Sequence, residues 1–126
     1  MSDDVTLTFA ADTTNVRLAR TVAAAMAARA DLPIDQLEDV RLAVDEAVSQ
    51  LILDARPGST ITCAFALDGG DLDVKVSALT RSGDLPATDT FSWTVLRALC
   101  DSVTAHSADL VVTLHLHVVR HIAVDA

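Results

Sequence analysis

Residues 33–51 constrain the fold of this chain more than any other segment. Apolar residues recur there at spacings of three and four, as in an amphipathic helix with one face on a core; they are Leu37, Val40, Val44, Val48 and Leu51. Pro33 suits the first turn of such a helix, because an N–H at that position would have no partner within the helix. Glu46 and Gln50 are four residues apart, so they lie beside each other on one helix face. This face combines a carboxylate that could accept a proton with an amide that could bind a metal ion or water.

The patterns on either side of this helix predict an α+β protein. The expected order is a strand at 5–10, a helix from the capping residues 12–15 to about 30, the helix from 33 to before 56, strands at 60–67 and 72–78, a helix at 91–100, and strands at 103–105 and 110–119. Asp68-Gly69-Gly70-Asp71 predicts a hairpin turn. We therefore expect a two-layer sandwich, in which about three helices cover one face of a mixed, mostly antiparallel sheet. The length of 126 residues predicts that 1–126 form a single domain.

Charge and composition narrow the possible partners. The net charge is -9 and Lys75 is the single lysine, which argues against direct binding to nucleic acid and suits a basic partner. No apolar run approaches the roughly 20 residues that span a bilayer, and the first four residues are acidic rather than basic like a secretory signal. We expect a cytoplasmic protein with no membrane contact, in which Cys63 and Cys100 are reduced thiols.

The run from Leu42 to Gln50 resembles the N-box of the GHKL (Bergerat-type) ATPases, in which a Glu-Ala-x-x-Asn run holds a catalytic Glu and a magnesium-binding Asn. Together with the element order and residues 91–103, it makes the chain similar to anti-sigma factors of the serine-kinase type. The resemblance implies the histidine-kinase-like ATPase fold, ATP and magnesium as cofactors, and a homodimer. It also implies two partners, an RNA polymerase sigma factor and a STAS-type anti-anti-sigma factor, which such kinases phosphorylate.

The resemblance assigns the nucleotide site residue by residue. Glu46 takes the place of the catalytic base, and Gln50 takes the place of the magnesium-binding Asn. The extra methylene of Gln moves its amide oxygen by more than about 1 Å, and magnesium tolerates poor octahedral geometry badly. A weakened magnesium site is therefore expected at Gln50.

The two glycine motifs of the family are also altered. The Asp that reads adenine falls on Ala78, and the spaced glycines that follow it fall on Thr80 and Ser82. The Gly-x-Gly pair that cradles phosphates falls on Thr90 and Ser92, with Phe91 between them. The segment in place of the mobile ATP lid is short. We expect an ATP site that is weakened or lost on a fold that still binds partners.

Partner contacts are assigned to the first helix. In the family this helix meets the sigma factor and the STAS antagonist through an Arg, and Arg20 occupies the matching position. Arg17 lies one turn earlier and could reinforce the contact. The planar guanidinium group suits such interfaces, although a surface arginine in a weak ion pair is the ordinary alternative.

These residues leave three classes of function open. The first is an anti-sigma factor that acts by binding, and the second is an active ATP-dependent serine/threonine kinase that phosphorylates the antagonist. The third is a sensory module whose altered pocket binds another small molecule. His115, His117 and His121 could bind a metal but more simply form a polar sheet face. Residues 91–93 could fill the phosphate pocket, meet a partner or pack in the core.

Overall fold

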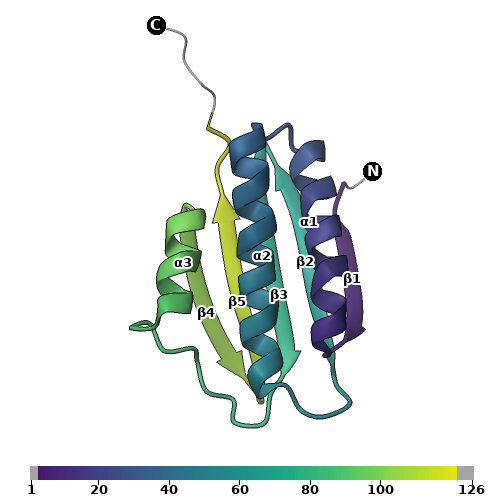
Figure 1. Cartoon of the computed structure of the whole chain (residues 1–126), viewed down its shortest axis with the longest axis vertical. Coiled ribbons are helices and arrows are strands. Elements are labelled where there is room, and N and C mark those ends of the chain that lie inside the picture. The colour runs from purple at the N-terminus through teal and green to yellow at the C-terminus, as the bar shows by residue number, and fades with distance from the viewer. Residues whose placement is uncertain (1–2, 122–126) are drawn as a thin grey trace, which may run out of the picture.

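The computed structural model describes residues 3–121 of the chain. In chain order its elements are β1 (Val5–Ala10), the short 3-10 helix η1 (Thr13–Asn15), α1 (Val16–Arg29), α2 (Ile34–Asp54), β2 (Thr60–Asp68), β3 (Asp71–Leu79), α3 (Phe91–Leu99), β4 (Ser102–Ala108) and β5 (Val111–Val118). Figure 1 shows α2 lying along the middle of the sheet, with α1 on the β1 side and α3 on the β4 side. The predicted order of helices and strands is confirmed.

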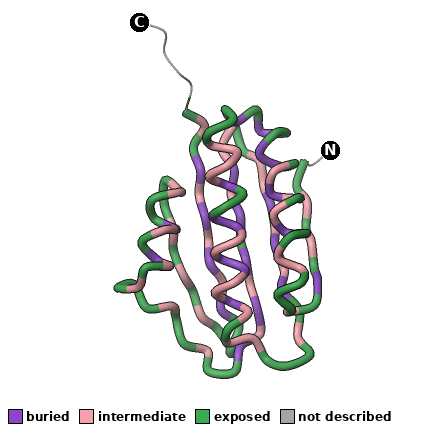
Figure 2. The backbone as a smooth tube through the Cα atoms, in the orientation of Figure 1, coloured by how far each residue is buried: buried purple, intermediate pink, exposed green. Residues whose placement is uncertain are grey.

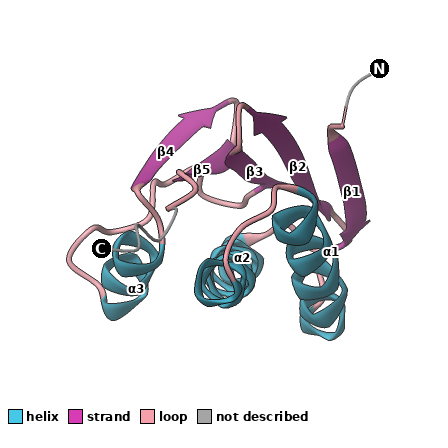
Figure 3. Cartoon of the chain, turned by 90° about the horizontal axis from the view of Figure 1, so that it is seen from above, coloured by secondary structure: helices cyan, strands magenta, loops and turns pink. Residues whose placement is uncertain are grey.

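The five strands form one sheet in the order β1-β2-β3-β5-β4. Each of the four pairings between neighbouring strands is antiparallel. Figure 3 shows that α1, α2 and α3 all lie on one face of this sheet, while the opposite face carries none of the described helices. The predicted two-layer α+β sandwich with a mostly antiparallel sheet is therefore confirmed, and the described pairings are all antiparallel rather than mixed.

The core lies between α2 and the middle strands, where Figure 2 shows buried residues on both layers. Val40, Val44, Val48 and Leu51 are buried as the helical stripe predicts, and Leu37 is partly buried at its edge. Burying one such aliphatic side chain is worth about 1.5–3 kcal/mol, so the stripe holds α2 firmly on the sheet. The helix that carries Glu46 and Gln50 thus has a fixed position.

Residues with positive φ form the turn between β2 and β3 and the carboxyl end of α1. Gly69 and Gly70 both have positive φ values of 59° and 96° and make the predicted two-residue hairpin turn between β2 and β3. Asp31 has φ 57°, and the amides of Asp31 and Leu32 donate to the carbonyls of Ala28 and Ala27. This is the Schellman arrangement that ends α1.

The last hairpin differs from the sequence prediction at its tip. β4 runs to Ala108 rather than ending at Ala105, and Leu110 belongs to the turn rather than to β5. Asp109 and Leu110 have φ values of 52° and 69°, a conformation that a leucine side chain disfavours. The apolar side chain of Leu110 made the turn look like the start of a strand.

Two further sequence features lie in this framework. None of the helices within residues 3–121 is long and apolar enough to cross a membrane. Cys63 is buried and Cys100 is partly buried, and both are free thiols. Burial raises the pKa of each thiol to about 12, with a further rise at Cys100 from the charges of Asp101 and Asp39. Neither cysteine is therefore an activated nucleophile.

Candidate functional site

A cavity of about 230 Å³ lies between the end of α2, the loop after β3 and β5. Nine residues line it: Gln50, Leu51, Leu53, Asp54, Thr80, Asp84, Leu85, Pro86 and Val112. Gln50 and Thr80 were predicted to belong to one site, and the structure brings them to the same cavity. The other lining residues were not foreseen. Asp54 had a usable signal, because it follows Gln50 by four residues and so shares its helix face.

Gln50 is hydrogen-bonded to another residue that the family resemblance assigns to the site. The hydroxyl of Ser92 on α3 donates to Gln50 Oε1 over 2.7 Å. The amide oxygen that would stand in for the magnesium ligand is thus already an acceptor for α3. This bond joins α2 to α3 across 42 residues of sequence, so the two assigned positions support each other structurally.

One backbone amide at the amino terminus of α3 is hydrogen-bonded to a side chain of the protein itself. Thr90 precedes the first helical residue, and its hydroxyl oxygen accepts from the backbone amide of Trp93 over 3.2 Å. Helix amino termini bind anions through amides of this kind. One of the amides that could meet a phosphate is therefore already paired with a side chain.

The loop after β3 is tied to α2 and to the last hairpin. Asp54 accepts from the Ser82 hydroxyl and forms an ion pair with Arg81 over 3.8 Å. Thr80 is 1% exposed, and both its amide and its hydroxyl donate to the carbonyl of Leu110, over 2.9 and 2.7 Å. The Thr80 hydroxyl also accepts from the amide of Gly83. Thr80 and Ser82 thus hold the loop in place.

Five of the seven assigned residues lie outside the lining of the cavity, namely Ser82, Thr90 and Ser92, described above, together with Ala78 and Glu46. Ala78 is buried inside β3 between Ile61 and Val112, and its methyl group offers no acceptor. Glu46 lies one helical turn before Gln50 and is half-buried. Within residues 3–121, no donor forms a hydrogen bond or ion pair with its carboxylate. Glu46 is therefore free to accept a proton, but it is not a wall of this cavity.

The residues present fit magnesium-bound ATP poorly as a set. The lining includes two carboxylates and no basic side chain. The position that the resemblance assigns to adenine recognition is an alanine, and the amide oxygen that it assigns to magnesium accepts from Ser92. Phe91, between the two assigned phosphate positions, is 83% exposed while Trp93 is buried. Trp93 therefore packs in the core, and Phe91 does not fill the pocket.

A second polar region lies on α1 and α2. Arg17 and Arg20 line two adjoining hollows of about 440 and 340 Å³, the first with Asp45 and the second with Arg41. Arg20 Nη1 lies 3.2 Å from Asp45 Oδ2, and Arg41 pairs with Glu38 over 2.8 Å. Within residues 3–121 the Arg17 guanidinium has no hydrogen bond or ion pair. The structure therefore brings the two arginines predicted to bind a partner to the same two hollows, and Arg41 lines the second of them.

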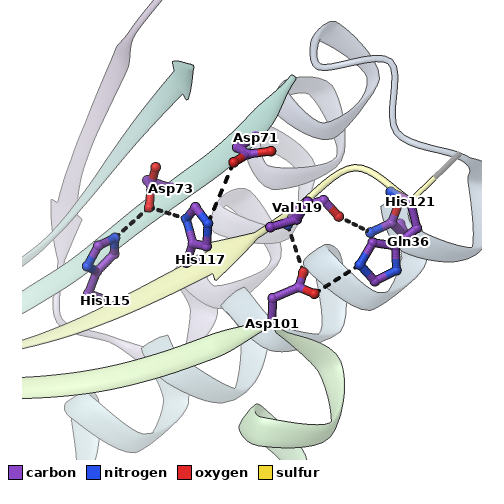
Figure 4. A network of polar contacts seen from close by, with 8 residues as sticks. All are labelled: Gln36, Asp71, Asp73, Asp101, His115, His117, Val119 and His121. Carbon is purple, nitrogen blue, oxygen red and sulfur yellow. Dashed lines mark hydrogen bonds and ion pairs between the residues drawn. The ribbon is translucent and has the colours of Figure 1, made fainter. Parts of the chain in front are cut away.

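His115, His117 and His121 belong to two separate networks of polar contacts, shown in Figure 4. His115 Nε2 and His117 Nδ1 lie 2.7 and 2.8 Å from the same oxygen of Asp73, whereas His121 pairs with Asp101 over 2.9 Å. No group of three or more His, Cys, Asp or Glu side chains within residues 3–121 is arranged to hold a metal ion. His115 and His117 thus form part of a hydrogen-bonded polar sheet face.

These contacts alter the acidity of the groups. Burial alone raises the pKa of Asp73, but the hydrogen bonds from His117 and His115 outweigh it and lower that pKa. The bond to Asp73 raises the pKa of His117, although burial opposes the rise. At Asp101 burial is likewise outweighed, here by the Val119 amide and His121, so its pKa is lowered. The contact between Asp73 and His117 therefore favours the charged forms of both groups, and the contacts of Asp101 favour its carboxylate form.

Comparisons with known proteins place this geometry in a family. The chain is 38% identical over 99 residues to proteins called anti-sigma-F factor RsbW from two strains of Mycobacterium tuberculosis, CDC 1551 / Oshkosh and H37Rv. That alignment covers 79% of this chain, and the chain spans 59% of the length of those relatives.

The fold and the family assignment follow from two further matches. The crystal structure of the RsbU and RsbW domains of Rv1364c from Mycobacterium tuberculosis superimposes with a TM-score of 0.77, at 17% identity, over 94% of this chain and 32% of that one. At this identity the match shows the fold. Residues 9–90 match the family model of the histidine kinase-like ATPase domain. The chain therefore belongs to the histidine kinase-like ATPase domain family.

Proposed function

We propose that this chain is an anti-sigma factor, a single-domain protein that sequesters an RNA polymerase sigma factor and is released by a STAS-type anti-anti-sigma factor. The observation that carries the proposal is its 38% identity over 99 residues to proteins called anti-sigma-F factor. The chain spans only 59% of the length of those proteins. Its activity and its partners are therefore proposed, and the structural features that support them follow.

The net charge of the chain suits a partner that is basic overall, but the arginines of α1 and α2 form a local basic surface that suits an acidic segment of that partner. Arg17, Arg20 and Arg41 surround adjoining hollows on a chain whose net charge is -9. The Arg17 guanidinium has no partner within residues 3–121, and the Arg20–Asp45 pair is partly exposed. An acidic segment of the sigma factor would find a free guanidinium and a second one held by a weak pair. The antagonist competes for an overlapping surface.

The test is direct binding to the sigma factors of the source bacterium, each immobilised in turn. We expect one of them to bind, and Arg17→Ala and Arg20→Ala to weaken that binding by about tenfold each, as loss of a charge-assisted contact does. Arg97→Ala on α3 is the matched control, because Arg97 is exposed and lies outside the two hollows. Failure of every sigma factor to bind would overturn the proposal.

We propose further that ATP binding is weakened or lost, so that release depends on relative affinity rather than phosphorylation. Support comes from Gln50 at the magnesium position, Ala78 at the adenine position and the Thr90 cap at the start of α3. The alternative is an active serine/threonine kinase with Glu46 as its base. Transfer of radiolabel from ATP to the STAS protein, absent in Glu46→Ala, would establish the kinase and refute the binding-only mechanism.

We propose that the protein acts in the cytoplasm, where sigma factors act. It would be a homodimer and would make no direct contact with nucleic acid or membrane. The low number of basic residues, 9 against 18 acidic ones, supports the lack of nucleic-acid contact.

A further inference from the structure

The cavity beside Gln50 has a charge that does not suit a nucleotide. Asp54 and Asp84 are among its lining residues, and none of the lining residues is basic. Asp54 already pairs with Arg81 and accepts from Ser82. The carboxylate of Asp84 is exposed and has no hydrogen bond or ion pair within residues 3–121. The cavity therefore offers one uncompensated negative charge at its mouth.

Most of the remaining wall is apolar. Leu51, Pro86 and Val112 line it together with Leu53 and Leu85, which are 77% and 53% exposed. Covering exposed leucines beside a hollow with an apolar group removes apolar surface from water, which makes the free energy of binding more favourable. A ligand for this cavity therefore has an apolar stem as well as a charge.

The polar groups of the cavity favour a donor over an acceptor. The Thr80 hydroxyl is used by Leu110 and Gly83, and the Gln50 amide oxygen already accepts from Ser92. The carboxylate of Asp84 remains as an unpaired acceptor, whereas that of Asp54 already accepts from Ser82 and pairs with Arg81. An ammonium or guanidinium group would satisfy Asp84, whereas a phosphate would be repelled.

We propose that this cavity is a binding site for a small organic cation, an amine or guanidine on a short alkyl stem, with Asp84 as its charge partner and Leu85 and Val112 against the stem. The inference deepens the proposal that the site no longer serves ATP. It does not depend on the sigma factor, because the arginines of α1 and α2 lie outside this cavity.

The experiment is a methyl NMR titration of the full chain with 1,5-diaminopentane, with 1,5-pentanediol as the neutral ligand of the same length. We expect saturable shifts at the methyl groups of Leu51, Leu85 and Val112 with the diamine and none with the diol. Asp84→Asn should weaken the diamine by about tenfold, the loss of one charge-assisted hydrogen bond. Asp89→Asn removes an exposed carboxylate from the same loop outside the cavity and should change the affinity less than twofold.

The possible results separate this inference from the loss of ATP binding. Absence of shifts, shifts scattered over the acidic surface, or equal weakening by Asp84→Asn and Asp89→Asn would each overturn the cation site and leave the proposal on ATP intact. Shifts of the same methyl groups with magnesium and ATP, at affinity equal to that of the diamine, would overturn both. Localised shifts that need Asp84 and exclude ATP support the inference.

Discussion

At the scale of single residues, Gln50 and Ser92, two positions that the resemblance assigns to the nucleotide site, are bonded to each other. The Ser92 hydroxyl donates to Gln50 Oε1 over 2.7 Å, so two positions assigned to magnesium and phosphate are joined by a hydrogen bond between α2 and α3. Both side chains are half-buried, and a hydrogen bond there contributes a net of about 0.5–1.5 kcal/mol to the free energy of unfolding. The altered site therefore stabilises the fold.

A double-mutant cycle tests this bond. Gln50→Ala and Ser92→Ala should each lower the free energy of unfolding, and together they should lower it by about 1 kcal/mol less than the sum of the two. Urea denaturation of the four proteins measures the coupling. Ser102→Ala, an exposed serine of β4, is the control partner for Gln50→Ala and should be additive. Additivity of the Gln50 and Ser92 changes would show that the bond contributes nothing in solution.

The pair of Asp73 and His117 gives the stability of the protein a pH dependence with a defined sign. The pKa of His117 is raised above 6.5 in the folded protein, so its contribution is complete below that value and is lost as pH rises through the folded pKa. The pKa of Asp73 is lowered below 3.8, so its contribution is present above that value and is lost as pH falls through the folded pKa. The pair therefore stabilises the fold most between about 3.8 and 6.5.

We therefore expect His117→Gln to lower the free energy of unfolding by up to about 1 kcal/mol at about pH 5 and by less at about pH 9. Urea denaturation at both pH values measures the difference between wild type and variant. His106→Gln is the control, because His106 is exposed on β4 and has no hydrogen bond or ion pair within residues 3–121. An equal loss at both pH values would contradict the assignment of the effect to the charged pair.

At the scale of secondary-structure elements, the end of α1 is held by an aspartate where glycine is usual. Asp31 has φ 57°, a left-handed conformation that costs a residue with a β-carbon about 1 kcal/mol relative to glycine. Asp31→Gly should therefore raise the free energy of unfolding by about 0.5–1 kcal/mol, whereas Asp31→Ala should not raise it. Both variants remove the same charge, so their difference in urea denaturation isolates the backbone effect. Equal stability of the two would show that the strain is absent.

The elements themselves were predictable because their signals are local. The apolar stripe on α2, the alternation in β2 and β3 and the Gly69–Gly70 turn each follow from a repeat over a few residues. The tip of the last hairpin was not, because β4 continues through the polar residues His106 and Ser107, and Leu110 adopts a turn conformation with φ 69°. Only tertiary contacts, such as the bonds from Thr80 to the Leu110 carbonyl, determine that conformation.

The candidate site could be predicted only in part for the same reason. Gln50, Thr80 and Ser92 carried a family pattern, and the structure connects Gln50 to Ser92 and to the cavity that Thr80 lines. Asp84 and Val112 carry no pattern that links them, because they come from a loop and a strand that meet only in the folded protein. Only the folded cavity brings the Asp84 carboxylate and the apolar side chain of Val112 together.

At the scale of the whole molecule, we propose that the uncovered face of the sheet is the interface of the homodimer. Figure 3 shows the three helices on the other face. The uncovered face has small, half-buried side chains at Thr62, Ala64, Ala66, Ser77 and Thr113, and beside them the charged and polar side chains of Asp73, Lys75, His115 and His117. The small side chains let a second sheet approach to about 10 Å along β2, the usual spacing of packed sheets. A second copy of the chain, related by a two-fold axis, would bring two such faces together.

This arrangement predicts that one substitution at the centre of the face separates the dimer. Ala64 lies opposite Thr6 on β1 and Lys75 on β3, so Ala64→Arg would place a long charged side chain between the two sheets without entering the core. Sedimentation equilibrium should give twice the chain mass for the wild type and the chain mass for Ala64→Arg. Ala25→Arg, on the exposed side of α1, should stay dimeric. A monomeric wild type would refute the homodimer, and a dimeric Ala64→Arg variant would move the interface to another face.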